Sequence, residues 1–143
     1  GRPALSAYIV ASTGVGALVG ALGSGYRTAS LGTAGGMLVA YAIALTVFAS
    51  TGEWHVALLS QVLIGYFYFS VMTSLQTVVQ QVVDDAKRGR VMSLFQVCWA
   101  GLVPFGGLGM GAAANAFGVV ASLLGAAGVC AAYGVLLILW QRD

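Results

Sequence analysis

The sequence predicts an all-α membrane protein with about five transmembrane helices. Of its 143 residues, 59% are hydrophobic and only 7% are charged, against roughly a quarter charged in an ordinary soluble domain. The few charges separate long uncharged stretches, each long enough for the roughly 20 apolar residues that cross a bilayer. These stretches lack the alternation of apolar and polar residues that marks membrane strands. The lipid bilayer is therefore the expected surrounding of the chain.

A single transmembrane domain is expected over residues 1–143, with helices at about 4–23, 31–51, 56–80, 91–114 and 117–140. Arg27, Glu53 and a charged cluster between Asp84 and Arg90 separate the first four helices. The uncharged stretch that follows the cluster is too long for one span and holds the last two helices. Asn115 is the expected break between them.

The basic residues predict the orientation of the helices. Five antiparallel spans bring Arg27, the loop with Lys87, Arg88 and Arg90, and Arg142 to one side of the membrane. An excess of Lys and Arg marks the cytoplasmic side, so the C-terminus is expected in the cytoplasm. The expected membrane is the inner or plasma membrane of the cell. The N-terminus of the segment then lies outside. Together with the missing initiator Met, this favours a fragment of a longer protein, and the alternative is a complete chain that inserts unaided.

Glycine is abundant, with 21 copies, and several glycines lie four residues apart. Lipid tails are as apolar as Leu, so helices in a bilayer associate through close packing, which small residues allow. The spacing predicts helix contacts at Gly16 and Gly20, Gly32 and Gly36, and Gly107 and Gly111, and chance spacing is the alternative. Pro104 lies in the middle of the fourth span and predicts a kink.

Catalytic and metal chemistry have little support in the sequence. The single histidine, His55, lies beside Glu53 and Trp54, a triplet typical of an interfacial anchor. Cys98 and Cys130 lie in apolar runs without a CxxC partner and are expected to pack as small side chains. We therefore expect no catalytic residue, no metal and no cofactor, and the sparse basic residues argue against a nucleic-acid partner.

Uncharged polar side chains gather in the third span. Gln61, Tyr68 and Gln76 are seven and eight residues apart, which places them near one helix face with Thr73 close by. Such a stripe predicts either a path for a small-molecule substrate or hydrogen bonds between helices. Trp99 in the fourth span is a weaker candidate for the path and is expected to face lipid.

The charged cluster carries a resemblance to a known family. The segment from Asp84 to Gln96, with the core Arg88-Gly89-Arg90-Val91-Met92-Ser93-Leu94, is similar to the cytoplasmic loop between the tenth and eleventh helices of major facilitator superfamily transporters. The efflux branch with siderophore and macrolide exporters is most similar. Leu75–Gln80 upstream and the downstream run of Gly101, Pro104, Gly106, Gly107, Leu108 and Gly111 also fit that branch. The resemblance covers nearly the whole chain and implies helices eight to twelve, with about seven helices missing.

The resemblance implies a secondary active permease, such as an antiporter, that exports small molecules by alternating access. Asp84, Asp85, Arg88, Gly89 and Arg90 would then form an inner gate, and the alternative is a cluster that only sets the topology. Two other classes are a non-transporting membrane subunit that packs on a partner through its glycines, and a membrane-embedded enzyme, which the missing catalytic groups disfavour. The proton-coupling carboxylate that such carriers often use is not found in these five spans.

Overall fold

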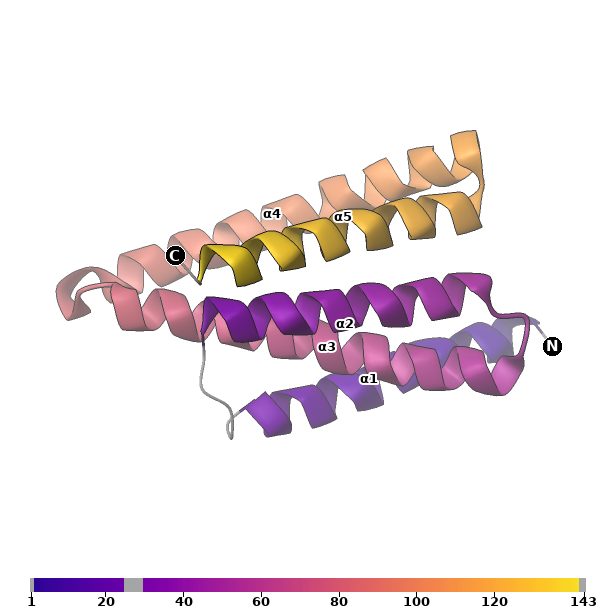
Figure 1. Ribbon diagram of the computed structural model, residues 1–143, viewed down its shortest axis with the longest axis horizontal. Helices are drawn as coiled ribbons and strands as arrows, with labels where there is room; N and C mark the ends of the chain where they lie inside the picture. Colours follow the sequence, from indigo (N-terminus) through magenta and orange to yellow (C-terminus); the bar gives the residue numbers. More distant parts are fainter. Residues whose placement is uncertain (1, 25–29, 142–143) are drawn as a thin grey trace.

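The computed structural model describes residues 2–24 and 30–141, and these residues form five α-helices without any strand (Figure 1). The helices are α1 (Arg2–Ser24), α2 (Leu31–Ser50), α3 (Trp54–Val82), α4 (Asp85–Phe117) and α5 (Val119–Trp140). The predicted all-α fold and the predicted number of helices are confirmed. Four helices begin and end within two residues of the predicted limits, and α4 is the exception.

Helix α4 begins six residues earlier than predicted, at Asp85 instead of residue 91. The Lys87 backbone N–H donates to the Asp84 carbonyl at 2.9 Å, and the Asp85 carboxylate lies in the first turn, where the helix dipole favours negative charge. The predicted limit followed hydropathy, whereas Lys and Arg are good helix formers. The charged cluster therefore makes up the first turns of α4 and is not a loop.

The turn between α4 and α5 lies at Gly118, so the predicted break at Asn115 is wrong. The helix continues through Asn115 to Phe117. Gly118 has φ 86° and ψ 156°, a backbone region that is essentially restricted to glycine. The Gly118 N–H still donates to the Ala114 carbonyl at 3.0 Å, and its own carbonyl accepts from the Ser122 N–H at 3.1 Å. Backbone freedom, not polarity, ends the helix.

The helices lie side by side in the order α1, α3, α2, α5, α4. Figure 1 shows α2 and α3 in the middle, α1 beyond α3, and the α4–α5 pair on the opposite side. The ends of α1, α3 and α5 lie together at one end of the bundle. Helix α4 packs mainly on α5 and touches α3 only slightly. Arg27 and Arg142, which the orientation argument used, lie outside the described residues.

Glycines allow α1 and α3 to approach closely. A Cβ atom built on Gly16 would collide with the Val62 carbonyl oxygen, and one on Gly20 would lie 2.5 Å from the carbonyl oxygen of Tyr66. From the other side, a Cβ atom on Gly65 of α3 would collide with the Thr13 carbonyl oxygen. The two backbones are therefore in direct contact, with no room for a side chain between them.

Helices α2 and α5 make a similar contact that the four-residue spacing did not reveal. A Cβ atom on Gly35 would lie 2.7 Å from the Gly134 carbonyl oxygen, and one on Gly134 would lie 2.8 Å from the Gly35 carbonyl oxygen. Gly32 faces the Gln141 side chain, while Gly36, Gly107 and Gly111 have no atom of the described chain within 4 Å of an added Cβ. Helix α4 runs without interruption through Pro104.

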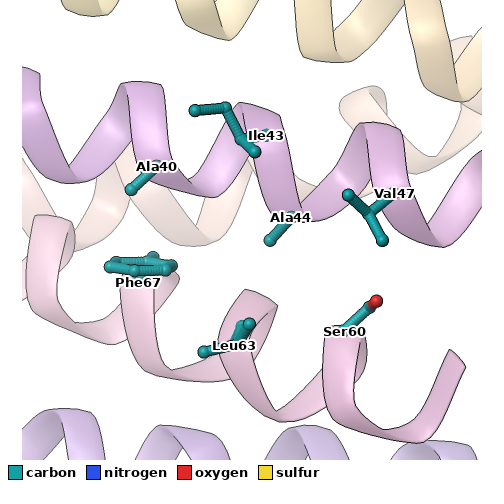
Figure 2. Close-up of a pocket in the computed structure, with 7 residues that line it drawn as sticks. All are labelled: Ala40, Ile43, Ala44, Val47, Ser60, Leu63 and Phe67. Carbon is teal, nitrogen blue, oxygen red and sulfur yellow. The ribbon is translucent and has the colours of Figure 1, made fainter. Parts of the chain in front are cut away.

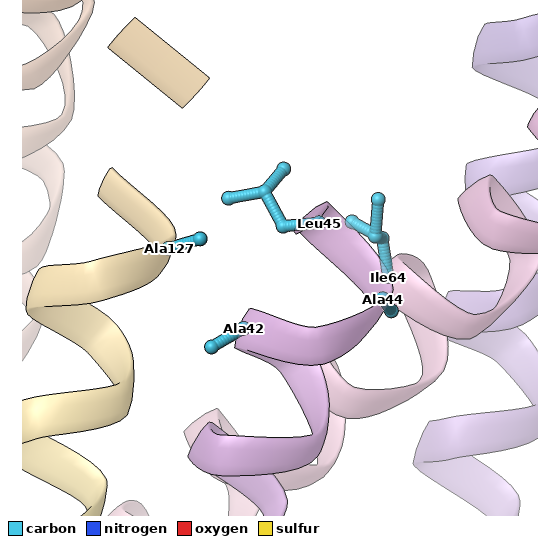
Figure 3. Close-up of a cluster of buried hydrophobic side chains, with 5 residues drawn as sticks. All are labelled: Ala42, Ala44, Leu45, Ile64 and Ala127. Atoms are coloured by element: carbon cyan, nitrogen blue, oxygen red, sulfur yellow. The ribbon is translucent and has the colours of Figure 1, made fainter. Parts of the chain in front are cut away.

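The buried hydrophobic core is small and consists mostly of alanine. Figure 3 shows its side chains at the junction of three helices: Ala42, Ala44 and Leu45 of α2, Ile64 of α3 and Ala127 of α5. Large apolar side chains are exposed on all five helices, and no residue of α4 is buried.

By length and composition, α2, α3, α4 and α5 could each cross a membrane, and α1 contains the shorter apolar stretch Ala7–Gly23. The fold is thus compatible with a multi-pass membrane protein.

Candidate functional site

The four polar residues predicted to line a substrate path do not form one cluster. Gln61 points to α1, where its side-chain oxygen accepts a hydrogen bond from the Thr13 hydroxyl at 3.2 Å. The Thr73 hydroxyl donates to the Phe69 carbonyl of its own helix at 2.8 Å. Tyr68 lies against Trp99 of α4, and Gln76 makes no hydrogen bond within the described residues. Gln61 thus matches the alternative of interhelical hydrogen bonding, and Tyr68 has an aromatic partner on α4.

Most other hydroxyl groups of the helices are satisfied locally. The hydroxyls of Thr46, Ser60, Thr77 and Ser122 each donate to the carbonyl four residues earlier, at 2.7–2.9 Å. Such bonds let Ser and Thr lie in an apolar helix without a partner on another helix. Several polar side chains of α3 therefore form their hydrogen bonds within the helix, so the polar composition of α3 does not by itself indicate a substrate path.

Tyr68 lines a half-open cavity of about 270 Å³ to which four helices contribute residues. We call it the aromatic cavity, and its lining residues are Leu38 and Tyr41 of α2, Tyr68, Val71, Met72 and Leu75 of α3, Trp99 of α4 and Cys130 of α5. The Tyr68 and Trp99 ring centroids are 5.9 Å apart with the planes tilted by 45°. No charged residue contributes to the wall, which is almost entirely carbon.

A second cavity, of about 360 Å³, lies between α1 and α3 on the other side of Tyr68. Its wall includes Val10, Thr13, Gly14 and Phe69, and Tyr68 contributes to both cavities. The Tyr68 side chain, which is 40% exposed, therefore borders two spaces.

A third cavity, of about 260 Å³, lies between α2 and α3 (Figure 2). Six of the seven side chains in Figure 2 are apolar: Ala40, Ile43, Ala44, Val47, Leu63 and Phe67. The seventh, Ser60, already donates its hydroxyl proton to the Val56 carbonyl at 2.7 Å. This cavity has only one aromatic side chain, and its single hydroxyl is already hydrogen-bonded. It therefore has fewer groups that could distinguish one ligand from another than the aromatic cavity has.

The charged cluster lies apart from these cavities, at the start of α4. An Arg88 guanidinium nitrogen lies 2.5 Å from an Asp85 carboxylate oxygen, and both side chains are exposed. Asp84 precedes the helix without a side-chain capping bond, Gly89 has open space around it, and Arg90 has no ion-pair partner within the described residues. The pair joins two residues of one helix, so it does not tie α4 to α3. Its role as a gate stays a prediction.

Among the residues of the aromatic cavity, Tyr41 and Cys130 were not predicted for a path from the sequence, and Trp99 was named only as a weaker candidate. They lie on three helices far apart in the chain, and no spacing rule brings them together. Trp99 was expected to face lipid, whereas its ring is half-buried against Tyr68. In the part of the chain that the structure describes, no three His, Cys, Asp or Glu side chains come close enough to hold a metal ion.

Comparison of the chain with known protein families, with curated proteins and with solved structures finds no match in any of the three. The likeness to facilitator transporters therefore rests on the residues around Arg88-Gly89-Arg90 and on the glycine pattern that follows them.

Proposed function

We propose that this chain is a membrane-embedded part of a small-molecule transporter of the major facilitator type, which exports its substrate by alternating access. The exterior supports the membrane location. Large apolar side chains such as Val10, Ile43, Leu59, Leu108 and Leu136 are more than 40% exposed on every helix. A soluble protein rarely exposes apolar surface of this extent, whereas lipid tails solvate it without cost.

The observation that carries the transport proposal is the environment of Tyr68. This side chain lies on the central helix α3, lines two cavities and contacts Trp99 across the helix boundary. A path for a solute needs space between helices, and rotation of a side chain that borders two spaces would join or separate them.

The proposed orientation places the charged start of α4 in the cytoplasm. Asp85, Lys87, Arg88 and Arg90 lie in the first turns of α4, at the bundle end where α3 also ends. The positive-inside rule supports a cytoplasmic location for this basic cluster, and a gate there would open as α4 moves relative to α3.

The orientation is tested by labelling in intact cells. Cys98 and Cys130 are replaced by Ser, and a single cysteine is introduced as Glu53→Cys or Lys87→Cys. A membrane-impermeant maleimide should label the variant at residue 53 in intact cells and the variant at residue 87 only after the cells are opened. Labelling in the reverse pattern would contradict the orientation, and labelling of both in intact cells would contradict a spanning α3.

Transport is tested in proteoliposomes that contain the protein from its full reading frame. An imposed proton gradient should drive the efflux of a neutral fluorescent dye by the parent protein. This efflux should be lost in Tyr68→Ala and kept in Tyr133→Ala. Tyr133 is the matched control because it is an exposed tyrosine of α5 that lines none of the three cavities. Equal efflux in the two variants would remove Tyr68 from the path, and the absence of efflux from the parent protein with every dye would count against a transporter.

The alternative is a non-transporting membrane subunit, and the exposure of α4 favours it. No residue of α4 is buried, and Gly101, Gly107 and Gly111 face open space. A partner helix packed on this glycine-rich side would bury it. Under this alternative the chain co-purifies with a second membrane protein in a fixed ratio and moves no dye, a result that the transporter proposal does not allow.

A further inference from the structure

We infer that the aromatic cavity binds an uncharged, ring-bearing small molecule. The size of the cavity sets the class of ligand first. A space of about 270 Å³ is larger than the roughly 150 Å³ cavity known to hold benzene and smaller than most drug sites. It therefore suits a molecule of one or two rings, not a macrolide or a peptide.

The wall then selects against charge. None of the eight lining residues is charged, and the charged residues from Glu53 to Arg90 lie outside the cavity, at the starts of α3 and α4. An ion that enters this cavity would lose its hydration and meet no counter-charge. The free-energy cost of that desolvation is far larger than the stabilisation from ring contacts. An uncharged molecule pays no such penalty.

The aromatic side chains favour rings over a lipid tail. Tyr41, Tyr68 and Trp99 come from three different helices, and the 45° tilt between the Tyr68 and Trp99 rings leaves their faces splayed around the space. Aromatic pairs in offset or edge-to-face geometry are stabilised by about 0.5–1.5 kcal/mol beyond area burial, a gain that an acyl chain does not receive.

The wall offers almost no polar surface, so contacts with the rings, and not hydrogen bonds, select the ligand. The inference concerns binding alone, so it stands or fails separately from the transport proposal; if both hold, the ligand is the substrate.

The test uses Trp99 as the only fluorescent donor. The full chain carrying Trp54→Phe and Trp140→Phe is placed in lipid nanodiscs, and 6-propionyl-2-(dimethylamino)naphthalene, a neutral two-ring fluorescent probe, is added. We expect saturable energy transfer from Trp99 to the probe, displaced by excess 1-naphthol. A signal that only rises in proportion to the probe, as from partition into lipid, would overturn the inference.

Cavity-filling variants link the signal to the cavity. Val71→Phe on α3 and Cys130→Phe on α5 place a ring in the space and should each weaken binding at least tenfold. Val103→Phe, on the exposed side of α4, is the matched control and should bind like the parent. Circular dichroism checks the helix content of each variant, and two filling variants on different helices keep the test decisive if one fails to fold. Unchanged binding in a folded filling variant would contradict the site.

Two further arms identify the occupant. A quaternary ammonium derivative of naphthalene, which is a cation with the same two rings as the probe, should not displace the probe, and displacement would overturn the uncharged class. Phospholipids with brominated tails should quench Trp99 less than Trp140 in the corresponding single-tryptophan proteins, because the Trp140 side chain is 74% exposed. Equal quenching would show that a lipid tail fills the cavity and would overturn the ring-bearing ligand.

Discussion

The direct backbone contact between α1 and α3 predicts a specific loss of stability when Gly20 is replaced by alanine. The new Cβ atom would lie 2.5 Å from the Tyr66 carbonyl oxygen and 3.1 Å from its Cα atom, where ordinary contact needs 3.4–4 Å. The obstacle is backbone, which cannot rotate away. Helix α1 must therefore move outward by most of an ångström along this contact, and the neighbouring contacts loosen with it.

The size of the effect follows from two opposing contributions. Inserting a methyl group into a close contact typically costs about 1–3 kcal/mol. Alanine in place of glycine within a helix returns about 0.5–1 kcal/mol because it restricts the unfolded chain. Gly14→Ala on the same helix supplies the control, since nothing lies within 4 Å of its added Cβ. Both variants receive the same helix gain, so the difference in unfolding free energy between them should equal the contact cost of about 1–3 kcal/mol.

The assay is reversible unfolding in mixed micelles with rising SDS fraction, followed by tryptophan fluorescence and circular dichroism. Gly20→Ala should unfold at a lower SDS fraction than the parent, and Gly14→Ala at an equal or higher one. Gly16→Ala should be worse than Gly20→Ala, because its Cβ would meet the Val62 carbonyl even more closely. If all three variants unfold together, α1 and α3 are not in backbone contact and the packing argument is refuted.

Three further predictions use the same unfolding assay. In a double-mutant cycle, Thr13→Val and Gln61→Leu should show a coupling of about 0.6 kcal/mol from their interhelical hydrogen bond, and strict additivity would contradict it. Gly118→Ala should cost about 1–3 kcal/mol because its φ of 86° and ψ of 156° are strained for any L side chain, whereas alanine at an open helical glycine should cost nothing. Asp85→Asn should change stability by less than about 1 kcal/mol, since its pair with Arg88 is exposed and lies within one helix; a larger loss would indicate a contact across helices.

The sequence predicted the helices well because membrane-compatible helices are marked by length and charge, which are local properties. It placed the start of α4 too late for the same reason: hydropathy marks where an apolar stretch begins, not where helical hydrogen bonds begin. The break before α5 was assigned to Asn115 by polarity, but the deciding property was the positive φ that Gly118 can adopt. Helix ends thus depend on backbone conformations that composition reports only indirectly.

Glycine spacing shows where local information ends. Gly16 and Gly20 lie against α3, whereas Gly107 and Gly111 share the same spacing and meet nothing in the described chain. The contact between Gly35 and Gly134 has no local signal at all, since each glycine matters only because the other helix is opposite. A four-residue repeat predicts that a helix can be approached closely, and the tertiary arrangement decides whether it is.

The same reasoning explains why the aromatic cavity could not be predicted from the sequence. The backbone contacts at Gly16 and Gly65, and at Gly35 and Gly134, tie α1 to α3 and α2 to α5, while α4 has few contacts with α3, and the Tyr68–Trp99 ring pair is one of them. The tightly joined helices form a frame, and the loosely joined helix completes the cavity wall with one aromatic side chain. A ligand between these rings would therefore act on the weakest helix contact of the bundle, where binding free energy can most easily change the arrangement of helices.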